Sequence, residues 1–358
     1  MTGIPVDMVL EIYMINIGNM SRPIYVLFLM ITCVSCSGKL GPHRSLIRLT
    51  ADVSSVNIET RSPFEGVPSA LNKLEMTTYF SYEKGVFTDP VSPVEPYIPC
   101  RTSVVFDSSD PKDVKYDDHP LEYPTSGTLA NNNVYCVGLY PNENWTVTTD
   151  NQSKTTSFSH VIDGDADVMW GEQIEGSHQN NFPPMKVEHL LTWVKINISA
   201  TSAKAAEVWG NVTDLTIYTP NDVVKINVSS SAKTTIEYTG TETPLKCISD
   251  PVTQPENLTV VAHQVGSKIC SPPEALNGQL GYRIVIKATG VNTEKEIFVP
   301  ILNKNGDPIS EQSEAVGALV PINLYFNEIA VVNGVCTLSY WEDVDEDLEL
   351  KEVVNSGN

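Results

Sequence analysis

Apolar residues recur at every second position in short runs through most of this sequence, and that alternation constrains the fold more than any other feature. The runs begin near residue 46 and end at Pro, Gly, Asn or Asp. In residues 194–198 and 224–228 the aliphatic side chains share one face while Lys and Asn occupy the other, which is typical of a half-buried antiparallel strand. The sequence therefore predicts an all-β protein with few short helices.

The alternation predicts strands in both halves of the chain. In the first half they span residues 46–56, 71–82, 102–106, 134–140 and 146–149. In the second half they span residues 192–199, 215–218, 223–228, 234–238, 258–263, 282–288, 295–301, 321–326, 328–332 and 335–341. Only residues 186–191 and 202–208 favour helix, each for at most two turns.

Length and turn composition predict two domains. At about 150 residues per domain, a chain of 358 residues accommodates roughly two. The polar, proline-containing stretch at residues 171–184 is the best place for a boundary. We expect two tandem antiparallel β-sandwiches, residues 62–180 and 181–341, preceded by an N-terminal segment of residues 36–61 and followed by an acidic tail of residues 342–358.

The N-terminal region has the features of an export signal. Residues 24–34 form an apolar run behind Arg22, which is too short to span a bilayer but suits the core of a signal peptide. We therefore expect residues 1–35 to be a signal peptide. Met20 closely precedes the basic residue and the run, so residues 1–19 are expected to be a mis-assigned start.

The apolar run leads into Cys36, and small residues precede this cysteine as in a bacterial lipobox. Cys33 occupies a position that is usually aliphatic in that motif. We expect lipidation of Cys36, which with two or more acyl chains would give stable membrane anchoring. Ordinary secretion with cleavage near Ser35 is the alternative.

The charge balance excludes several classes of partner. The chain carries 23 Lys+Arg against 44 Asp+Glu, a formal net charge of -21. Clustered basic residues are needed to displace the counterions of a nucleic acid, and this sequence contains no such run. We therefore expect no nucleic-acid partner and no binding to anionic lipid by charge alone.

Of the 7 cysteines, all but Cys33 and Cys36 lie in the region expected to fold. Their spacings contain no CxxC motif and no histidine partner, so a zinc site is not expected. Cys247 and Cys270 are the most local candidates for a disulfide. Small buried thiols on strands are the favoured interpretation for most of these cysteines, which are Cys100, Cys136, Cys247, Cys270 and Cys336.

The sequence contains no recognisable catalytic constellation. It has no GxSxG elbow, no HExxH motif and no phosphate-binding glycine loop. Residues 163–167 begin like a calcium loop, but Val168 stands where the sharp turn needs glycine and Ile174 where a bidentate glutamate belongs. We expect a plain acidic turn there, no metal, no cofactor and no enzymatic activity. His160, His178 and His189 are expected to be ordinary solvent-facing or loop histidines.

The tryptophans admit two interpretations. Trp145, Trp170, Trp193 and Trp209 could form a sugar-stacking platform if they were exposed. Large aromatic residues on alternating strands are more often part of the core, and this is the interpretation that we favour.

Several motifs taken in order resemble the fimbrillin-like lipoproteins that build type V pili. The resemblance covers nearly all of residues 36–345 and rests on the lipobox followed by Thr60-Arg61-Ser62-Pro63-Phe64-Glu65-Gly66, Asp167-Val168-Met169-Trp170-Gly171, His189-Leu190-Leu191-Thr192-Trp193-Val194-Lys195-Ile196, residues 321–329 and Leu338-Ser339-Tyr340-Trp341. It implies two transthyretin-like sandwiches, export as a lipoprotein, and a surface-exposed place on the outer membrane and in a fimbria after processing.

In such subunits an arginine-specific protease removes the lipid and the first strand, and a neighbouring subunit's donor strand fills the open groove. The resemblance thus implies other pilus subunits as partners, and it leaves room for host or bacterial surface ligands. Arg61 is the favoured cleavage site because it follows the expected first strand, and Arg48 and Arg44 are the alternatives. An uncut turn at Arg61 is an equally open interpretation.

The acidic tail offers a candidate donor strand. Val344, Leu348, Leu350 and Val354 occupy even positions, while charged residues occupy most odd ones. Glu346 and Glu352 interrupt the apolar face, so a solvated tail is the competing interpretation. The alternative for the whole protein is a carbohydrate-binding surface lipoprotein of a glycan-uptake system, which would show an exposed row of aromatic residues.

Overall fold

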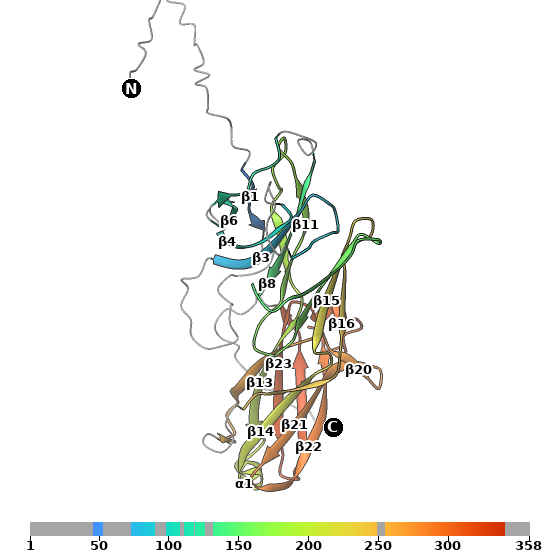
Figure 1. Ribbon diagram of the computed structural model, residues 1–358. Helices are drawn as coiled ribbons and strands as arrows, with labels where there is room; N and C mark the ends of the chain where they lie inside the picture. The colour runs from blue at the N-terminus through green and yellow to red at the C-terminus, as the bar shows by residue number, and fades with distance from the viewer. Residues whose placement is uncertain are drawn as a thin grey trace, which may run out of the picture. The chain divides into compact units, whose positions relative to one another are not determined.

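The computed structural model describes residues 46–52, 73–89, 98–107, 111–117, 119–125, 132–248 and 255–340 (Figure 1). Of these residues, 58% lie in strands and 4% in helices, so the predicted all-β class is confirmed. The helical elements are α1 (Ala203–Trp209) and the short 3-10 turn η2 (Gln312–Ala315). No helix in the described part of the chain is long and apolar enough to cross a membrane.

The N-terminal half contains a six-stranded sheet with two buried faces. Its strand order is β2-β12-β11-β8-β3-β4, which corresponds to Ala51–Asp52, Met185–His189, Met169–Gly176, Val134–Tyr140, Lys73–Ser81 and Cys100–Asp107. Side chains alternate between the faces, as the two-residue period of a strand requires. In β3, Met76 and Phe80 lie on one face and Tyr79 on the other.

A four-stranded sheet packs on the Tyr79 face of the six-stranded sheet. Its order is β16-β15-β10-β9, formed by Thr235–Thr239, Val223–Ser229, Thr155–Val161 and Thr146–Asp150. Phe158, Val224 and Ile226 of this sheet share a buried cluster with Trp170 of β11. The hairpin β15-β16 lies after the expected boundary at residues 180/181, yet it pairs with β10.

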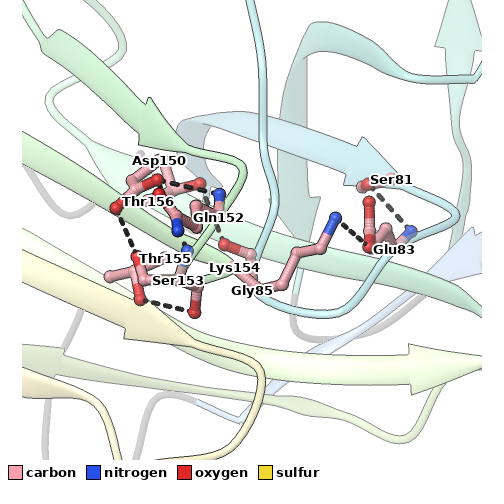
Figure 2. Close-up of polar contacts among 9 residues, drawn as sticks. All are labelled: Ser81, Glu83, Gly85, Asp150, Gln152, Ser153, Lys154, Thr155 and Thr156. Atoms are coloured by element: carbon pink, nitrogen blue, oxygen red, sulfur yellow. Dashed lines mark hydrogen bonds and ion pairs between the residues drawn. The ribbon is translucent and has the colours of Figure 1, made fainter.

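Polar contacts fasten the β9–β10 turn to the connection that follows β3 (Figure 2). Lys154 Nζ lies 2.7 Å from Glu83 Oε1, and the Thr156 hydroxyl donates to the Gly85 carbonyl at 3.0 Å. Gly85 has a φ of 74°, and a Cβ at this position would lie 2.3 Å from the backbone nitrogen of Ser230. Only glycine fits there, so this contact ties the two sheets together at one end of β3.

The C-terminal half is one mixed sheet that surrounds a core of its own. Its main path is β17-β14-β21-β22-β24-β23-β13-β19, formed by Thr243–Lys246, Asn211–Thr219, Gln279–Ala288, Val291–Leu302, Val332–Thr337, Ala318–Phe326, Thr192–Ala200 and His263–Cys270. Three short strands lie off this path: β18 (Glu256–Asn257) pairs with β14, β20 (Glu274–Leu276) with β21, and β25 (Ser339–Tyr340) with β23. Figure 1 shows β13, β14, β21, β22 and β23 gathered in this half.

Three expected elements are wrong. Residues 186–191, expected as helix, belong largely to β12, because Met185 and Val187 alternate into a buried cluster. Residues 258–262 form no strand, and β19 begins only at His263. Residues 328–331 form the turn between β23 and β24, in which the Asn327 side chain accepts backbone hydrogen bonds from Ile329 and Val331. The short helix expected at residues 202–208 is confirmed as α1.

Candidate functional site

The first segment, residues 46–52, supplies side chains to the core of the N-terminal half. Ile47 is 0% exposed and Leu49 is 1% exposed, whereas Arg48 between them is exposed. Ala51 is half-buried and packs against the same cluster. The segment thus presents alternate side chains inward, as its sequence pattern predicts.

The backbone of the first segment is held by residues from other parts of the chain. The Ile47 amide donates to the Leu121 carbonyl at 2.8 Å, and the Val114 amide donates to the Ile47 carbonyl at 3.1 Å. The Met185 amide donates to the Thr50 carbonyl at 2.8 Å. Strand β1 (Arg48–Leu49) pairs antiparallel with β5 (Lys112–Asp113), and β2 pairs parallel with β12.

The buried cluster beneath the first segment forms an apolar seat, which we call the groove. It contains residues of the other five strands of the six-stranded sheet, and Ile47, Leu49 and the partly buried Ala51 of the first segment belong to the same cluster. The buried residues of the groove are Leu74, Met76, Phe80, Ile98, Cys100, Val104, Phe106, Val114, Leu121, Tyr123, Val134, Cys136, Met169, Phe182, Met185 and Val187. Residues 112–123 contribute to the groove beside the first segment through Val114, Leu121 and Tyr123.

Two glycines give methionine side chains room in the groove. A Cβ at Gly171 would lie 2.3 Å from Met185 Sδ, and one at Gly138 would lie 2.8 Å from the same sulfur. Met76 Cε would lie 3.1 Å from a Cβ at Gly138. Flexible methionines therefore pack closely over the sheet here, which suits a surface that must accommodate different apolar side chains.

Two thiols also lie in the groove. Cys100 and Cys136 are buried and free, and Phe80 of β3 pairs with both of them across neighbouring strands. Burial raises the pKa of Cys100 to about 12 and raises the pKa of Cys136 well above its ordinary value. Both thiols are therefore protonated and inaccessible in the folded chain.

A charged pair lies on the outer side of the first segment. Arg48 Nε is 2.9 Å from Asp113 Oδ1, and the two residues are direct partners in the β1–β5 ladder. Their side chains are 53% and 39% exposed, so the pair contributes at most about 1 kcal/mol. The burial of Ile47 and Leu49 is larger, at roughly 1.5–3 kcal/mol for each side chain before the ordering entropy is subtracted.

Of the expected processing residues, only Arg48 lies within the described part of the chain. Arg48 lies inside β1, where pairing holds its backbone in the sheet. Cys36, Arg44 and Arg61 lie outside the described residues, as do the candidate donor residues Val344, Leu348, Leu350 and Val354. The expected first strand, residues 46–56, is described as far as Asp52.

The carboxylates of residues 163–167 turn to separate protein partners. Asp163 Oδ1 accepts from the Asp165 and Ala166 amides at 2.9 and 3.0 Å. Asp165 pairs with Lys268 at 2.6 Å, and Asp167 contacts His189 Nδ1 through side chains that are both mostly buried. Among the described residues no three His, Cys, Asp or Glu side chains are placed to hold a metal ion.

His160, expected in a loop or facing solvent, is instead a buried residue of β10, because the strand turns its side chain inward. Its Nδ1 lies 2.7 Å from the Val161 carbonyl oxygen, and its ring meets Trp145 edge-on with 5.0 Å between the ring centres. Burial lowers the pKa of His160 below its ordinary value. The Val161 backbone and the nearby Asp163 oppose this effect without reversing it.

This lowered pKa predicts a loss of stability in acid. Because the unfolded chain takes up the proton first as the pH falls below about 6.5, the free energy of unfolding should fall through that range. A His160→Gln chain should show a smaller difference in unfolding midpoint between pH 7.5 and pH 5.5, measured by urea denaturation. The control, a His178→Gln chain changed at an exposed histidine, should keep the full difference. If the two variants show the same difference in unfolding midpoint, the lowered pKa of His160 does not account for the loss of stability in acid.

The tryptophans lie mainly in the core, which confirms the favoured interpretation. Trp170, Trp193 and Trp209 are buried, and Trp145 is partly buried against the cluster between the two N-terminal sheets. These four residues form no exposed row. These tryptophans therefore give no support to a sugar-stacking platform.

A polar hollow of about 330 Å³ opens beside β3 and β4. Its lining is Thr77, Asp89, Arg101, Thr102, Ser103, Tyr116 and Asn142. Much of this polar lining is already engaged within the protein, since Arg101 pairs with Asp89 at 3.1 Å and the Thr102 hydroxyl donates to the Lys115 carbonyl at 2.7 Å. The hollow therefore gives no specific support to a sugar site.

The five cysteines within the described residues are free, so the candidate disulfide between Cys247 and Cys270 is not formed. Sequence reasoning did find the first segment from its alternation. It missed Gly138, Gly171 and Met185 in the groove, because the helix expected at residues 186–191 hid the strand that carries the methionine.

A scan of the sequence against protein-family models finds no match, and a search of the curated proteins finds none either. Solved structures with a similar fold include a proposed cell adhesion protein from Bacteroides uniformis, with 12% identity, a TM-score of 0.49, and coverage of 84% of this chain and 98% of that chain. A second, from Bacteroides ovatus, has 13% identity, a TM-score of 0.46, and coverage of 85% and 99%.

The fimbrial anchor protein Mfa2 from Porphyromonas gingivalis is also similar, with 8% identity, a TM-score of 0.36, and coverage of 83% of this chain and 97% of that chain. These neighbours are adhesion and fimbrial proteins. Identities of 13% or less and TM-scores of 0.49 or less do not assign a function to this chain.

Proposed function

We propose that this chain is a non-enzymatic structural subunit of a surface fimbria, assembled by replacement of its first segment with a strand from another subunit. The observation that carries the proposal is the first segment itself. It places Ile47 and Leu49 in the groove, and its strand β2 lies at the edge of the six-stranded sheet. An edge segment with deeply buried alternate side chains is suited to exchange.

The physical basis is strand addition. Without the first segment, β12 would present unpaired backbone groups and the groove would expose apolar side chains and methionines. An extended segment from a neighbour satisfies the backbone and buries its alternate side chains in the same places. The free energy of joining two subunits then comes from the same kinds of contact that hold the first segment.

Processing is part of the proposal. Lipidation at Cys36 would hold the exported chain at the outer membrane, and cleavage after Arg61 would free the first segment together with the lipid. Cleavage after Arg48 is disfavoured, because a protease needs an extended, accessible backbone and Arg48 is paired within β1. Surface ligands of the assembled fimbria would be a second class of partner.

Thiol labelling tests whether the first segment is removable. In a chain with Cys136 as its only cysteine and a specific protease site engineered within residues 57–61, we expect slow labelling by iodoacetamide before cleavage. After cleavage and dilution, Cys136 should react at least about 100-fold faster, because loss of Ile47 and Leu49 opens the buried cluster in which this thiol lies, and lesser burial lowers its pKa toward the ordinary value. Intact-mass measurement follows the label.

The matched control is a chain that retains only Cys270, which lies in the C-terminal core. Its thiol should stay protected after the same cleavage. If Cys136 stays as protected as Cys270 after the first segment has been cut, the proposed exchange is wrong. If both thiols become reactive, cleavage unfolds the chain and the proposal is equally wrong.

A further inference from the structure

The groove recognises a strand in two ways. Its interior takes the fully buried Ile47 and Leu49 and the half-buried Ala51. Its rim carries Asp113, whose carboxylate meets Arg48 between the two buried positions. The affinity of a bound strand should therefore depend on the size of its side chains at alternate positions and on the charge of the residue between them.

The chain's own acidic tail fits this arrangement poorly. Within residues 342–358, Leu348 and Leu350 are the only aliphatic residues spaced two apart, so they alone can fill both fully buried positions. In either strand direction this register puts Glu349 in the place of Arg48, opposite Asp113. It also puts Glu352 or Glu346 in the place of Ala51.

Both replacements are unfavourable. Like charges directly opposite each other in a ladder repel, whereas Arg48 and Asp113 attract. A glutamate in the half-buried place of Ala51, whose ladder partner is the buried Met185, must lose part of its hydration. No other register of the tail places aliphatic residues in both fully buried positions.

We propose that the groove selects an extended segment of a different protein in which a basic residue stands between two aliphatic residues, and that it rejects the tail of this chain. This inference rests on the proposed strand exchange. The first segment has the accepted pattern, Ile47-Arg48-Leu49, but the proposed cleavage removes it from each mature subunit. The fimbria is then built from more than one kind of subunit at this groove.

The test is a competition for the groove of the full chain cut at the engineered site within residues 57–61. One fluorescent peptide carries residues 45–53 and a second carries residues 346–354. A third carries the second sequence with Glu349→Arg and Glu352→Ala. Fluorescence anisotropy gives the affinity of each, and we expect the native tail peptide to bind at least about tenfold more weakly than the other two.

The charge of the rim provides a second readout. An Asp113→Arg chain should bind the residues 45–53 peptide more weakly and the native tail peptide more tightly, while Asp113→Asn should bind with intermediate preference. The exposed position of Asp113 makes both variants compatible with folding. The preference due to this charge should shrink in about 1 M salt, because exposed pairs are screened.

The outcomes separate the two proposals. If the native tail peptide binds as tightly as the residues 45–53 peptide, strand exchange stands and the selectivity is wrong. If no peptide binds, both proposals are wrong. If the Asp113→Arg chain keeps the original preference, the charge of Asp113 does not determine which peptide binds. The proposed selectivity is then wrong, whereas strand exchange is not contradicted.

Discussion

A chain in which Leu49 is replaced by Asp is expected to release its first segment while the C-terminal half stays folded. Leu49 is 1% exposed, so the substitution removes a buried aliphatic side chain and puts a carboxylate in its place. Burying an unpaired charge costs several kcal/mol, which together with the lost burial is about 3–5 kcal/mol. That is comparable to the roughly 3–6 kcal/mol that burial of Ile47 and Leu49 contributes before the ordering entropy is subtracted, so undocking is the expected response.

Labelling of Cys136 in the uncut chain measures this opening. The rate should rise by about 100-fold or more, while Cys270 remains protected in a separate core. Arg48→Ser is the matched control, because it alters the adjacent outward-facing residue and removes only a surface ion pair. Equal labelling of Cys136 in the Leu49→Asp chain and this control would contradict a docked, separable first segment.

Replacing Trp209 with Ala should destabilise the C-terminal half by about 3–5 kcal/mol. Trp209 is 0% exposed and ends α1. Its ring meets Phe326 edge-on with 4.9 Å between the ring centres, and its Nε1 donates to the Asn327 carbonyl at 2.8 Å. The substitution leaves a large cavity and removes the hydrogen bond that fixes the turn after β23.

The matched control is Trp145→Ala, in which the lost ring is only partly buried. Its loss in the free energy of unfolding should be clearly smaller, because less apolar surface returns to water. Chemical denaturation followed by circular dichroism measures both. If Trp145→Ala lowers the free energy of unfolding as much as Trp209→Ala does, the extent of burial does not determine the size of the loss.

The local pattern of apolar residues was enough to predict the positions of many strands. The expected strand at residues 134–140 is β8 at the same bounds, and the one at residues 192–199 is β13 with one further residue. Both alternate or run apolar over most of their length, so a two-residue period leaves little choice. The helix at α1 was also predictable, with Ser202 at its N-cap accepting the Ala205 amide.

Other strands carried a weak local signal. Strand β10 alternates threonine and serine with few apolar residues, yet Thr156 and Phe158 are buried on the side that faces the six-stranded sheet. Strand β12 was expected as helix, and its pairing with β11 and β2 is what extends it. In both cases the burial comes from distant parts of the chain, which override local propensity.

For the groove, too, some features were predictable from local sequence and others were not. The alternation of Ile47, Arg48 and Leu49 was visible in the sequence, because period two is a local property of a strand. That these side chains lie in one cluster with Met185, and that Asp113 faces Arg48, depends on pairings between residues far apart in the chain. Local sequence specifies which face of a strand is apolar, but only the packed tertiary structure decides which partner covers it, because non-local pairing is set by the shape and closure of the whole sheet.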